Sequence, residues 1–471
     1  MSPWEPIADI AAKVRAGDLK AVDLVEKSLA AIDDRAEFKA ILATTADRAR
    51  ERAVAVDAGD NKGRLAGVPF IAKDNYLVFG ADTTAASNIL KGFDAPYQST
   101  VIEKLEAEGA ICVAKANLDA FAHGASTENS DFYTTLNPHD KTRVPGGSSG
   151  GSAASVVLGL APFALGTDTG GSTRQPASFV GCVGYKPTYG LMSRSGIVAM
   201  GSSLDTVGTF AATVADAELV IDVMAGKDEL DSTTIDRDAA GYLVDAADLN
   251  GKKVGVIKEY MGEGLADDVR QQIETAIQKL RDAGADVIEV SLPSISLALA
   301  VYYILCPAEV SSNLSRYDGQ RYGFSQPDAA DLADSYTKTR EFGFGKEAKR
   351  RIMIGTYVLS SGYYDAYYKK AQTVRTKLIA EAAAAFGQVD FLIGPVAPTT
   401  AFKIGENANN PLAMYLADVM TVAINLIGIP AISVPCGTSG AGLPVGLQII
   451  APQKADRELL AIAAAAEGIL R

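Results

Sequence analysis

The sequence predicts an α/β fold in which helices flank a central mixed β-sheet. Short apolar runs typical of buried strands alternate with stretches of helical periodicity along most of the 471 residues. Hydrophobic residues make up 48% of the chain and charged residues 21%, close to the average for soluble globular proteins. One long segment, about residues 297–385, is almost wholly helical in pattern and rich in tyrosine. We interpret it as a helical insertion beside the sheet.

Two periods in the hydrophobic pattern locate the individual elements. Apolar residues at helical spacing predict helices at Ile7–Arg15, Phe38–Val56, Val101–Glu108, Val269–Ala283, Gln372–Ala385 and Leu459–Leu470. Short apolar runs predict strands at Val68–Ala72, Ile111–Ala114, Phe163–Gly166, Lys253–Ile257, Ala285–Val290, Phe391–Ile393, Ala431–Val434 and Val445–Ile450. Because helices and strands alternate, we expect a mixed sheet that is largely parallel.

Charge and the length of apolar runs exclude several classes of protein. The chain carries 44 Lys and Arg against 57 Asp and Glu, a formal net charge of −13. An acidic chain is not expected to bind nucleic acid by itself, because that binding depends on a basic surface that releases counterions. The longest nearly apolar stretches, such as Ala154–Gly166, are shorter than the ~20 residues that span a bilayer. Met1–Asp9 also lacks the apolar run of a secretory signal, so we expect a cytoplasmic protein without membrane contact.

Cysteine and histidine limit the chemistry that the chain can perform. The four cysteines are scattered without CxxC spacing, so neither a zinc site nor a disulfide framework is predicted. With only His123 and His139, a histidine-based triad or a multi-histidine metal site is not expected. We expect catalysis to use other side chains, with no metal or organic cofactor in this chain.

Two glycine-rich segments are the strongest local signals. They read Pro145-Gly-Gly-Ser-Ser-Gly-Gly-Ser152 and Gly166-Thr-Asp-Thr-Gly-Gly-Ser172. A glycine-rich turn that enters a helix can bind phosphate on its N–H groups. Neither a Gly-Lys-Ser/Thr sequence nor a GxGxxG after a strand is present, however, so the support for a nucleotide site is weak.

A nucleophilic site is the second interpretation of the same segments. Ser148, Ser149, Ser152 and Ser172 lie on glycine-flanked turns, where consecutive N–H groups can point at one oxygen. Lys73 follows a predicted strand, so burial would favour its neutral amine, which can take a proton from a serine. From these features alone, ordinary turn glycines with hydrogen-bonded hydroxyls remain the alternative.

Together these residues resemble the amidase signature family. The similarity runs through Gly67-Val-Pro-Phe-Ile-Ala-Lys-Asp-Asn75, both glycine-rich segments and Gly184-Tyr-Lys-Pro-Thr188. Lys73 precedes Ser148 by 75 residues and Ser148 precedes Ser172 by 24, which matches the Lys–Ser–Ser spacing of that family. The resemblance covers nearly the whole chain, and it implies a single amidase signature domain over residues 1–471.

The resemblance implies a mechanism of amide hydrolysis. Ser172 would be the acyl nucleophile, and Ser148, on a cis peptide with Gly147, would relay its proton. Lys73 would be the general base and then the acid that protonates the leaving ammonia. Covalent catalysis of this kind divides amide cleavage into two steps with lower barriers.

Neighbouring residues would support this chemistry. The resemblance implies an oxyanion hole made by the backbone N–H groups of Thr169, Gly170, Gly171 and Ser172. Ser149 and Arg174 would support the loop, and a purely structural role is the alternative for both.

The helical insertion is similar to the glutamine-hydrolysing subunits of tRNA-dependent amidotransferases. The similarity lies in Ser311–Gly323, Lys349–Gly355 and Ser360–Gln372. Glutamine is zwitterionic, so a specific site needs a cation for its carboxylate and an anion for its ammonium group.

The same resemblance implies which residues would bind glutamine. Arg351 would bind the carboxylate, Asp418 the ammonium group, and Tyr302 would form a hydrogen bond nearby. The alternatives are a charge on the helix surface for Arg351, a solvated helix position for Asp418 and simple packing for Tyr302. Tyr303 is a competing candidate for the role of Tyr302.

Partners also follow from the resemblance. The chain would hydrolyse glutamine and supply ammonia to a partner subunit, which would use ATP and Mg to amidate Glu-tRNA(Gln) or Asp-tRNA(Asn). Two other subunits are expected, with tRNA bound only through the complex. The sequence leaves open which tRNA is served. Alternatives are a stand-alone amidase of simple or aromatic amides and a non-catalytic scaffold, against which the retained Lys–Ser–Ser set argues.

One loop departs from the family pattern. The family usually has Asn-Met-Asp-Glu-Phe-Ala-Met-Gly-Ser where this chain has Asn117-Leu-Asp-Ala-Phe-Ala-His-Gly-Ala125. Ala120 thus replaces an acid and His123 a methionine. The resemblance places this loop at the amide end of the substrate or at the ammonia exit, where His123 would be a polar gate. A tolerated packing change is the alternative.

Overall fold

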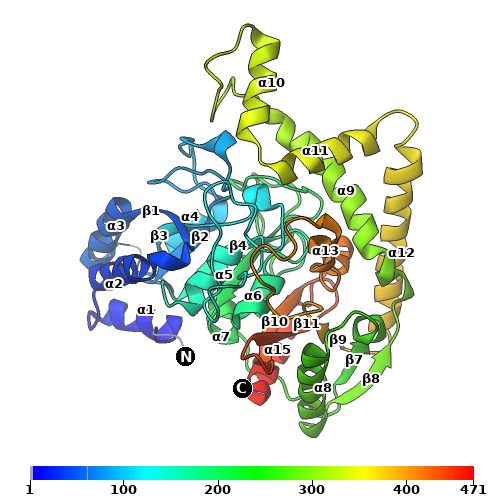
Figure 1. Cartoon of the computed structure of the whole chain (residues 1–471). Helices are drawn as coiled ribbons and strands as arrows, with labels where there is room; N and C mark the ends of the chain where they lie inside the picture. Colours follow the sequence, from blue (N-terminus) through cyan, green and yellow to red (C-terminus); the bar gives the residue numbers. More distant parts are fainter. Residues whose placement is uncertain (1–3, 61) are drawn as a thin grey trace.

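The computed structural model describes residues 4–60 and 62–471, and its centre is one continuous β-sheet (Figure 1). The sheet has 11 strands in the order β1-β3-β2-β4-β6-β5-β10-β11-β9-β7-β8. The strands are β1 (Ile41–Thr44), β2 (Pro69–Lys73), β3 (Ile111–Ala116), β4 (Phe163–Asp168), β5 (Val183–Lys186), β6 (Thr206–Ala211), β7 (Lys253–Ile257), β8 (Asp286–Val290), β9 (Phe391–Pro395), β10 (Ala431–Thr438) and β11 (Pro444–Ile450).

Helices cover the sheet and extend from one end of it. The α-helices are α1 (Ile7–Ala16), α2 (Ala21–Asp34), α3 (Ala46–Ala58), α4 (Thr100–Ala107), α5 (Gly150–Val157), α6 (Arg174–Val180), α7 (Val214–Met224), α8 (Asp267–Asp282), α9 (Ala298–Asn313), α10 (Leu332–Gly343), α11 (Lys346–Leu359), α12 (Lys370–Phe386), α13 (Pro411–Leu416), α14 (Val422–Ile427) and α15 (Asp456–Leu470). Helices α5 and α6 pack on the central strands, while α8 and α15 pack on β10. The predicted α/β class with a central mixed sheet is therefore confirmed.

The sheet is mixed, but the expectation that it is largely parallel is wrong. Parallel pairs occur on one side among β3, β2 and β4 and on the other among β9, β7 and β8. The middle of the sheet, from β4 through β6, β5, β10 and β11 to β9, is antiparallel at every step. Hydrophobic periodicity reports burial of a strand, whereas strand direction depends on how each connection crosses the sheet.

Three strands were not predicted from the sequence. The segment Phe38–Val56 was expected to be one helix, but β1 occupies its start and pairs antiparallel with β3 before α3 begins. β5 and β6 contain Gly and Thr among their apolar residues, so they lack the continuous apolar run that marked the other strands. The predicted helices and strands elsewhere correspond to elements of the structure, with boundaries that differ by a few residues.

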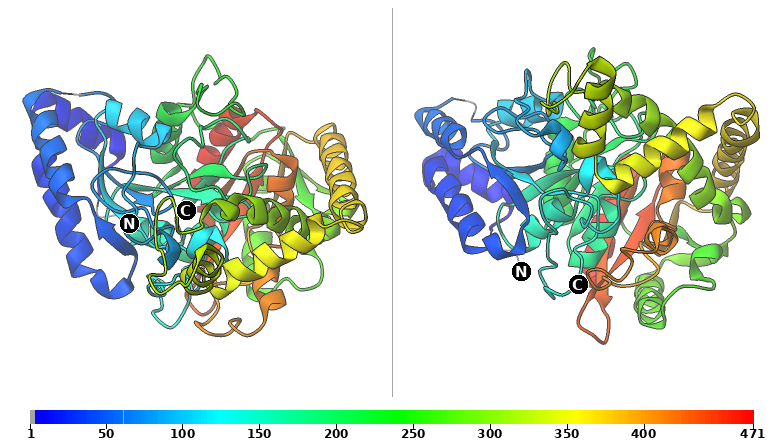
Figure 2. Two further views of the ribbon diagram at one scale, coloured as in Figure 1. Left: turned by 90° about the horizontal axis from the view of Figure 1, so that it is seen from above. Right: turned by 45° about the horizontal axis from the view of Figure 1, so that its top comes forward.

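The segment predicted as a helical insertion is helical from α9 to α12. Figure 1 shows α10 projecting from the top of the molecule and α12 lying along its right side, and Figure 2 shows this segment at the opposite end from the N-terminal helices. α9 packs against α11, α12 and α14. A short π-helix, Asp365–Lys369, leads into α12.

Two features of α9 bear on the site. A helical stretch of 24 residues, Pro293–Arg316, is long and apolar enough to cross a membrane by composition, so Ala154–Gly166 is not the longest such stretch. More than half of its most apolar window is buried inside the protein, as in a core helix. α11 crosses α9 at Gly355, where an added Cβ would lie 1.8 Å from the carbonyl oxygen of Pro307. The absence of a side chain at Gly355 thus allows α11 to lie close to α9.

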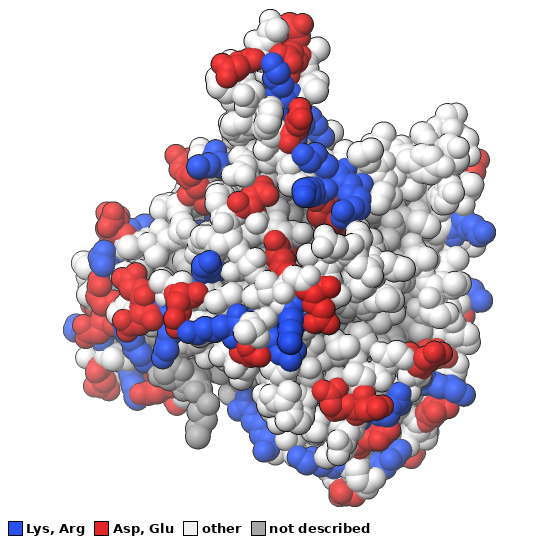
Figure 3. Space-filling view, viewed as in Figure 1, with Lys and Arg blue, Asp and Glu red and all other residues white. Residues whose placement is uncertain are grey.

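Charges of both signs are distributed over the surface. In the face that Figure 3 shows, acidic and basic side chains are interspersed, and no continuous basic surface covers that face. This distribution agrees with the net charge of −13.

Candidate active site

Lys73 lies at the end of β2 and contacts three hydroxyl groups. Its Nζ is 2.8 Å from Ser148 Oγ, 2.8 Å from Ser149 Oγ and 2.9 Å from Thr167 Oγ1. β2 and β4 are neighbours in the sheet, which places Thr167 beside Lys73. The turn before α5 contributes the two serines. The sequence prediction that Lys73 and Ser148 meet is thus correct.

The environment of Lys73 favours its neutral amine. Burial lowers the pKa of Lys73 to about 7, although the carboxylates of Asp119, Asp168 and Asp205 act in the opposite direction. The Ser149 hydroxyl donates to the carbonyl oxygen of Thr167 at 3.2 Å, so Lys73 donates to Ser149. A neutral amine has one lone pair, and the Ser148 hydroxyl can donate its proton to it.

The main chain around Ser148 is held on both sides. The Gly147–Ser148 peptide is cis, as expected from the resemblance. The N–H of Gly147 donates to Gln175 Oε1 at 3.0 Å, and the carbonyl of Ser148 accepts from the N–H of Asp119 at 3.1 Å. A Cβ at position 147 would lie 2.2 Å from Asp119 Oδ2, so only glycine fits there. The position of Ser148 is therefore set by its surroundings.

Ser172 lies in the turn between β4 and α6. The N–H of Ser149 donates to the carbonyl oxygen of Ser172 at 3.3 Å, which brings this turn against the one that carries Ser148. Ser172 is 8% exposed, whereas Lys73 and Ser148 are fully buried. Of the three predicted catalytic residues, Ser172 is therefore the one that incoming substrate can reach.

A buried ion pair supports the turn that carries Ser172. Arg174 Nη2 lies 2.9 Å from Asp168 Oδ1, and Arg174 Nε lies 3.0 Å from Asp168 Oδ2. Burial opposes ionisation of Asp168, but the adjacent Arg174 lowers the pKa of this carboxyl to about 2. Arg174 also donates to Asn425 and Gln448, which ties the turn to α14 and β11. Arg174 thus has the supporting position that the resemblance implied.

The same carboxylate changes the predicted oxyanion hole. The N–H of Gly171 donates to Asp168 Oδ1 at 2.9 Å. Sequence reasoning placed this N–H among four donors to the oxyanion, but the structure gives it another acceptor. Thr169, Gly170 and Ser172 are the remaining donors of that set.

Tyr302 and Tyr303 take separate positions in the site. A Cβ on Gly170 would lie 2.7 Å from Tyr302 Cζ, so the Tyr302 ring lies directly on the turn before Ser172. Tyr303 instead stacks on Tyr415 with ring centroids 3.9 Å apart. Of the two candidates, Tyr302 is therefore the one beside the nucleophile.

Arg351 is inside the protein. It is 2% exposed, so the alternative of a charge on the helix surface is wrong. Its Nε donates to Glu347 Oε1 at 2.9 Å, and its guanidinium lies 5.1 Å from the ring centre of Tyr303. Among the residues that the structure describes, Arg351 Nη1 has no hydrogen-bond partner. An unpaired donor on a buried cation is available for an anionic group.

Asp418 lies in the connection before α14 and is also buried, so a solvated position is excluded. Burial raises the pKa of Asp418 well above its usual range, although the charge of Arg351 acts against this. A ligand cation beside Asp418 would favour the ionised carboxylate. Arg351 and Asp418, 67 residues apart in sequence, are thus brought into electrostatic contact by the fold.

Sequence reasoning missed some residues that shape the site. Asp119 accepts hydrogen bonds from the N–H groups of Ser126, Thr127 and Asn129, and burial raises the pKa of Asp119 to about 6. Glu347 orients Arg351, and its position four residues earlier on the same helix was a signal that could have found it.

The divergent loop is buried. His123 and Ala120 are both inside the protein, so a surface substitution is excluded for each. His123 Nδ1 and Nε2 have no hydrogen-bond partner in the described part of the chain.

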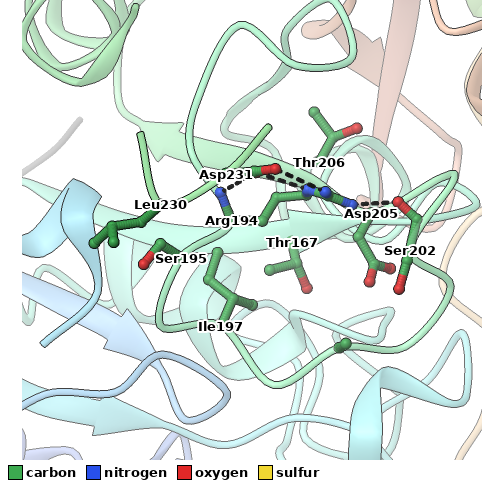
Figure 4. Close-up of a pocket in the computed structure, with 10 residues that line it drawn as sticks. Thr167, Arg194, Ser195, Ile197, Ser202, Asp205, Thr206, Leu230 and Asp231 are labelled. Atoms are coloured by element: carbon green, nitrogen blue, oxygen red, sulfur yellow. Dashed lines mark hydrogen bonds and ion pairs between the residues drawn. The ribbon is translucent and has the colours of Figure 1, made fainter. Parts of the chain in front are cut away.

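A cavity of about 180 Å³ is lined in part by Thr167, the residue that accepts from Lys73 (Figure 4). Its lining includes Arg194 and Asp231, which form an ion pair at 2.9 Å, and Asp205, which accepts from Thr169 Oγ1 at 2.7 Å. Ser172, Arg351 and Asp418 do not line it, so we do not assign it to the substrate.

Comparison with known proteins identifies similar chains. The family model described as "Amidase" matches residues 23–460. The A-type subunit of the glutamyl-tRNA(Gln) amidotransferase from Koribacter versatilis is 51% identical over 439 residues, which are 92% of each chain. The protein of the same name from a Cyanothece species is 54% identical over 418 residues, 87% of this chain and 86% of the relative.

Solved structures give the same result. The crystal structure of the A-type glutamyl-tRNA(Gln) amidotransferase subunit from Thermotoga maritima has a TM-score of 0.78 and 41% identity, over 94% of this chain and 91% of that one. A bacterial aryl acylamidase of the amidase signature family has a TM-score of 0.86 with 25% identity, over 99% of this chain and 96% of that one. The fold is thus common to both types, while the sequence is more similar to that of the amidotransferase.

Proposed function

The chain belongs to the amidase signature family, and from this membership we propose that it is the glutamine-hydrolysing subunit of a tRNA-dependent amidotransferase. The single observation that carries the proposal is the buried Arg351, whose Nη1 lacks a partner among the described residues while Asp418 lies in its field. Propionamide and other simple amides have no charge to bind to either group. A free amino acid with a carboxamide side chain has a carboxylate for Arg351 and an ammonium group for Asp418.

Acylation uses the hydroxyl and amine contacts of the site. Ser172 Oγ attacks the carboxamide carbon of glutamine and passes its proton to Ser148, which passes its own to the neutral Lys73. The N–H groups of Thr169, Gly170 and Ser172 stabilise the oxyanion that forms. Lys73 then returns the proton through Ser148 to the leaving nitrogen, so that ammonia departs and a glutamyl ester of Ser172 remains.

Deacylation repeats these steps with water. The water attacks the ester carbon, its proton passes through Ser148 to Lys73, and the Ser172 alkoxide leaves and is reprotonated. The net reaction is glutamine plus water to glutamate plus ammonia. Ser149 and Tyr302 act on the reacting groups through Lys73 and Gly170, respectively, and we assign both a positioning role.

The proposal includes partners. Ammonia would pass to a second subunit that uses ATP and Mg to amidate Glu-tRNA(Gln) or Asp-tRNA(Asn), and a third subunit would complete a cytoplasmic heterotrimer. The names of the relatives support an assembly of subunits. Because this chain is acidic, we expect tRNA to bind chiefly to the partner.

The test is ammonia release from glutamine and from propionamide in parallel. The Ser172→Ala variant is the blank, and the assay is repeated on the complex co-purified from cells if the isolated chain is silent. We expect preference for glutamine, with Arg351→Met abolishing activity on glutamine and sparing that on propionamide. Preference of the complex for propionamide, or equal losses in the Arg351→Met variant, would identify a general amidase.

A further inference from the structure

His123 is a buried polar residue that the proposed mechanism does not use. Its side chain is 0% exposed, and neither Nδ1 nor Nε2 has a hydrogen-bond partner within residues 4–60 and 62–471. Burying a polar group without a partner costs free energy. An apolar side chain of similar size would avoid this cost, so the imidazole requires an explanation.

The loop that carries His123 is held by many contacts. The carboxylate of Asp119 accepts three backbone N–H groups, and Asn129 Nδ2 donates to the carbonyl of His123 at 2.9 Å. Phe121 and Ala122 adopt φ angles of 53° and 62°, which non-glycine residues rarely take. The imidazole is therefore fixed in place by its backbone.

The loop also packs against the beginning of α11. The Phe121 ring lies 6.3 Å from the His123 ring and 5.6 Å from that of Phe344, which lies two residues before α11. Arg351 is in the second turn of this helix, and its Nη1 is likewise buried without a partner in the described chain. The three unpaired nitrogens thus belong to two side chains whose supporting elements are packed together.

The charge of Arg351 reaches the imidazole. Burial, reinforced by this charge, lowers the pKa of His123 well below its usual value. The other charged groups that act on Arg351 are Glu347 and the neighbouring phenols, while Asp418 lies within reach of its field. His123 is therefore a neutral imidazole, which offers one N–H donor and adds no second positive charge.

We propose that His123 is a second binding residue for the substrate carboxylate, donating a ring N–H to one oxygen while Arg351 Nη1 donates to the other. This inference rests on the proposed function. Two converging donors suit a group with two acceptor oxygens, and the positive charge of Arg351 disfavours an ammonium group in the same place. Asp418 is left to bind the ammonium group. The pair would select substrates that carry a free carboxylate.

The test compares three substitutions at position 123 in the complex co-purified from cells. His123→Met removes both ring nitrogens, His123→Asn retains a donor where Nδ1 lies, and His123→Gln retains one where Nε2 lies. The control is His139→Met, because His139 Nε2 is bonded to the carbonyl of Val180 at 2.8 Å, outside the site. Initial rates of ammonia release are measured over a range of glutamine and propionamide concentrations.

For His123→Met we expect KM for glutamine to rise at least about tenfold, with a much smaller change in kcat. The loss of kcat/KM on glutamine should exceed that on propionamide by the same factor. One of the Asn and Gln variants should recover most of the affinity, which would identify the donating nitrogen. The thermal midpoint of the free complex should be unchanged or higher in His123→Met, since an unpaired polar group has been removed.

The opposite results would overturn the inference. An unchanged KM for glutamine in His123→Met, or equal losses on both substrates, would assign His123 to packing alone. If all three variants lowered the thermal midpoint alike and neither amide restored binding, the imidazole would be structural. Failure of the proposed function is distinguishable, because the unmodified complex would then not prefer glutamine.

Discussion

The ring of Tyr302 lies on Gly170 so closely that a Cβ on this glycine would come within 2.7 Å of Tyr302 Cζ. Tyr302 belongs to α9 of the helical insertion, and Gly170 belongs to the turn between β4 and α6 that carries Ser172. The insertion therefore borders the proposed nucleophile directly. This contact explains how residues far from the glycine-rich segments can determine which amide is hydrolysed.

Replacing Gly170 by Ala should displace either the turn or the Tyr302 ring. A shift of about 1 Å in an active site can cost about 100-fold in rate, so we expect a loss of that order in kcat/KM for glutamine. Adding Tyr302→Leu should restore part of the activity, because the smaller side chain makes room. Gly468→Ala is the control, since no other atom lies within 4 Å of the added Cβ. Full activity in Gly170→Ala would contradict the contact.

The rate should depend on pH through Lys73. Burial lowers the pKa of Lys73 to about 7, and only the neutral amine can accept the proton of Ser148. The value of kcat/KM should therefore rise about tenfold per pH unit below pH 7 and level off above it. The Lys73→Arg variant should be inactive throughout, because its side chain stays cationic. A pH-independent rate from about pH 5 to about pH 9 would exclude Lys73 as the base.

The Asp168–Arg174 pair should contribute to stability as well as to activity. Asp168→Asn leaves the buried Arg174 without its counter-ion, and breaking such a pair costs on the order of 3 kcal/mol in the free energy of unfolding. Urea denaturation followed by circular dichroism measures this loss. The matched control is Asp365→Asn, which removes an exposed pair with Lys369 and should leave the midpoint unchanged. Equal midpoints for the two variants would argue against a supporting role.

Gly355→Ala should separate α11 from α9, because the added Cβ would lie 1.8 Å from the carbonyl oxygen of Pro307. Since Arg351 is one turn away on α11, we expect a larger loss of activity on glutamine than on propionamide. Overpacking of this kind costs about 1–3 kcal/mol in the free energy of unfolding. Parallel kinetic assays on both amides check the prediction. Unaltered glutamine kinetics would mean that α11 can shift without moving Arg351.

Most helices and strands could be predicted because their patterns are local. The apolar run Lys253–Ile257 and the helix near Val269–Ala283 both appear in the structure close to the predicted bounds. The direction of the central strands could not be predicted. β5, β6 and β10 run antiparallel to their neighbours because of how their connections cross the sheet, and hydrophobic spacing contains no record of that.

The α/β class, the family and the order of Lys73, Ser148 and Ser172 could be inferred from the amino-acid sequence alone, because the motifs that carry them are contiguous and their spacing is constrained. Three-dimensional packing was needed to establish that Arg351 and Asp418 are buried, that Tyr302 lies on Gly170, and that Asp168 accepts from the Gly171 N–H. Burial and hydrogen-bond partners depend on which distant segments pack together, whereas a local pattern specifies only the element on which a residue lies.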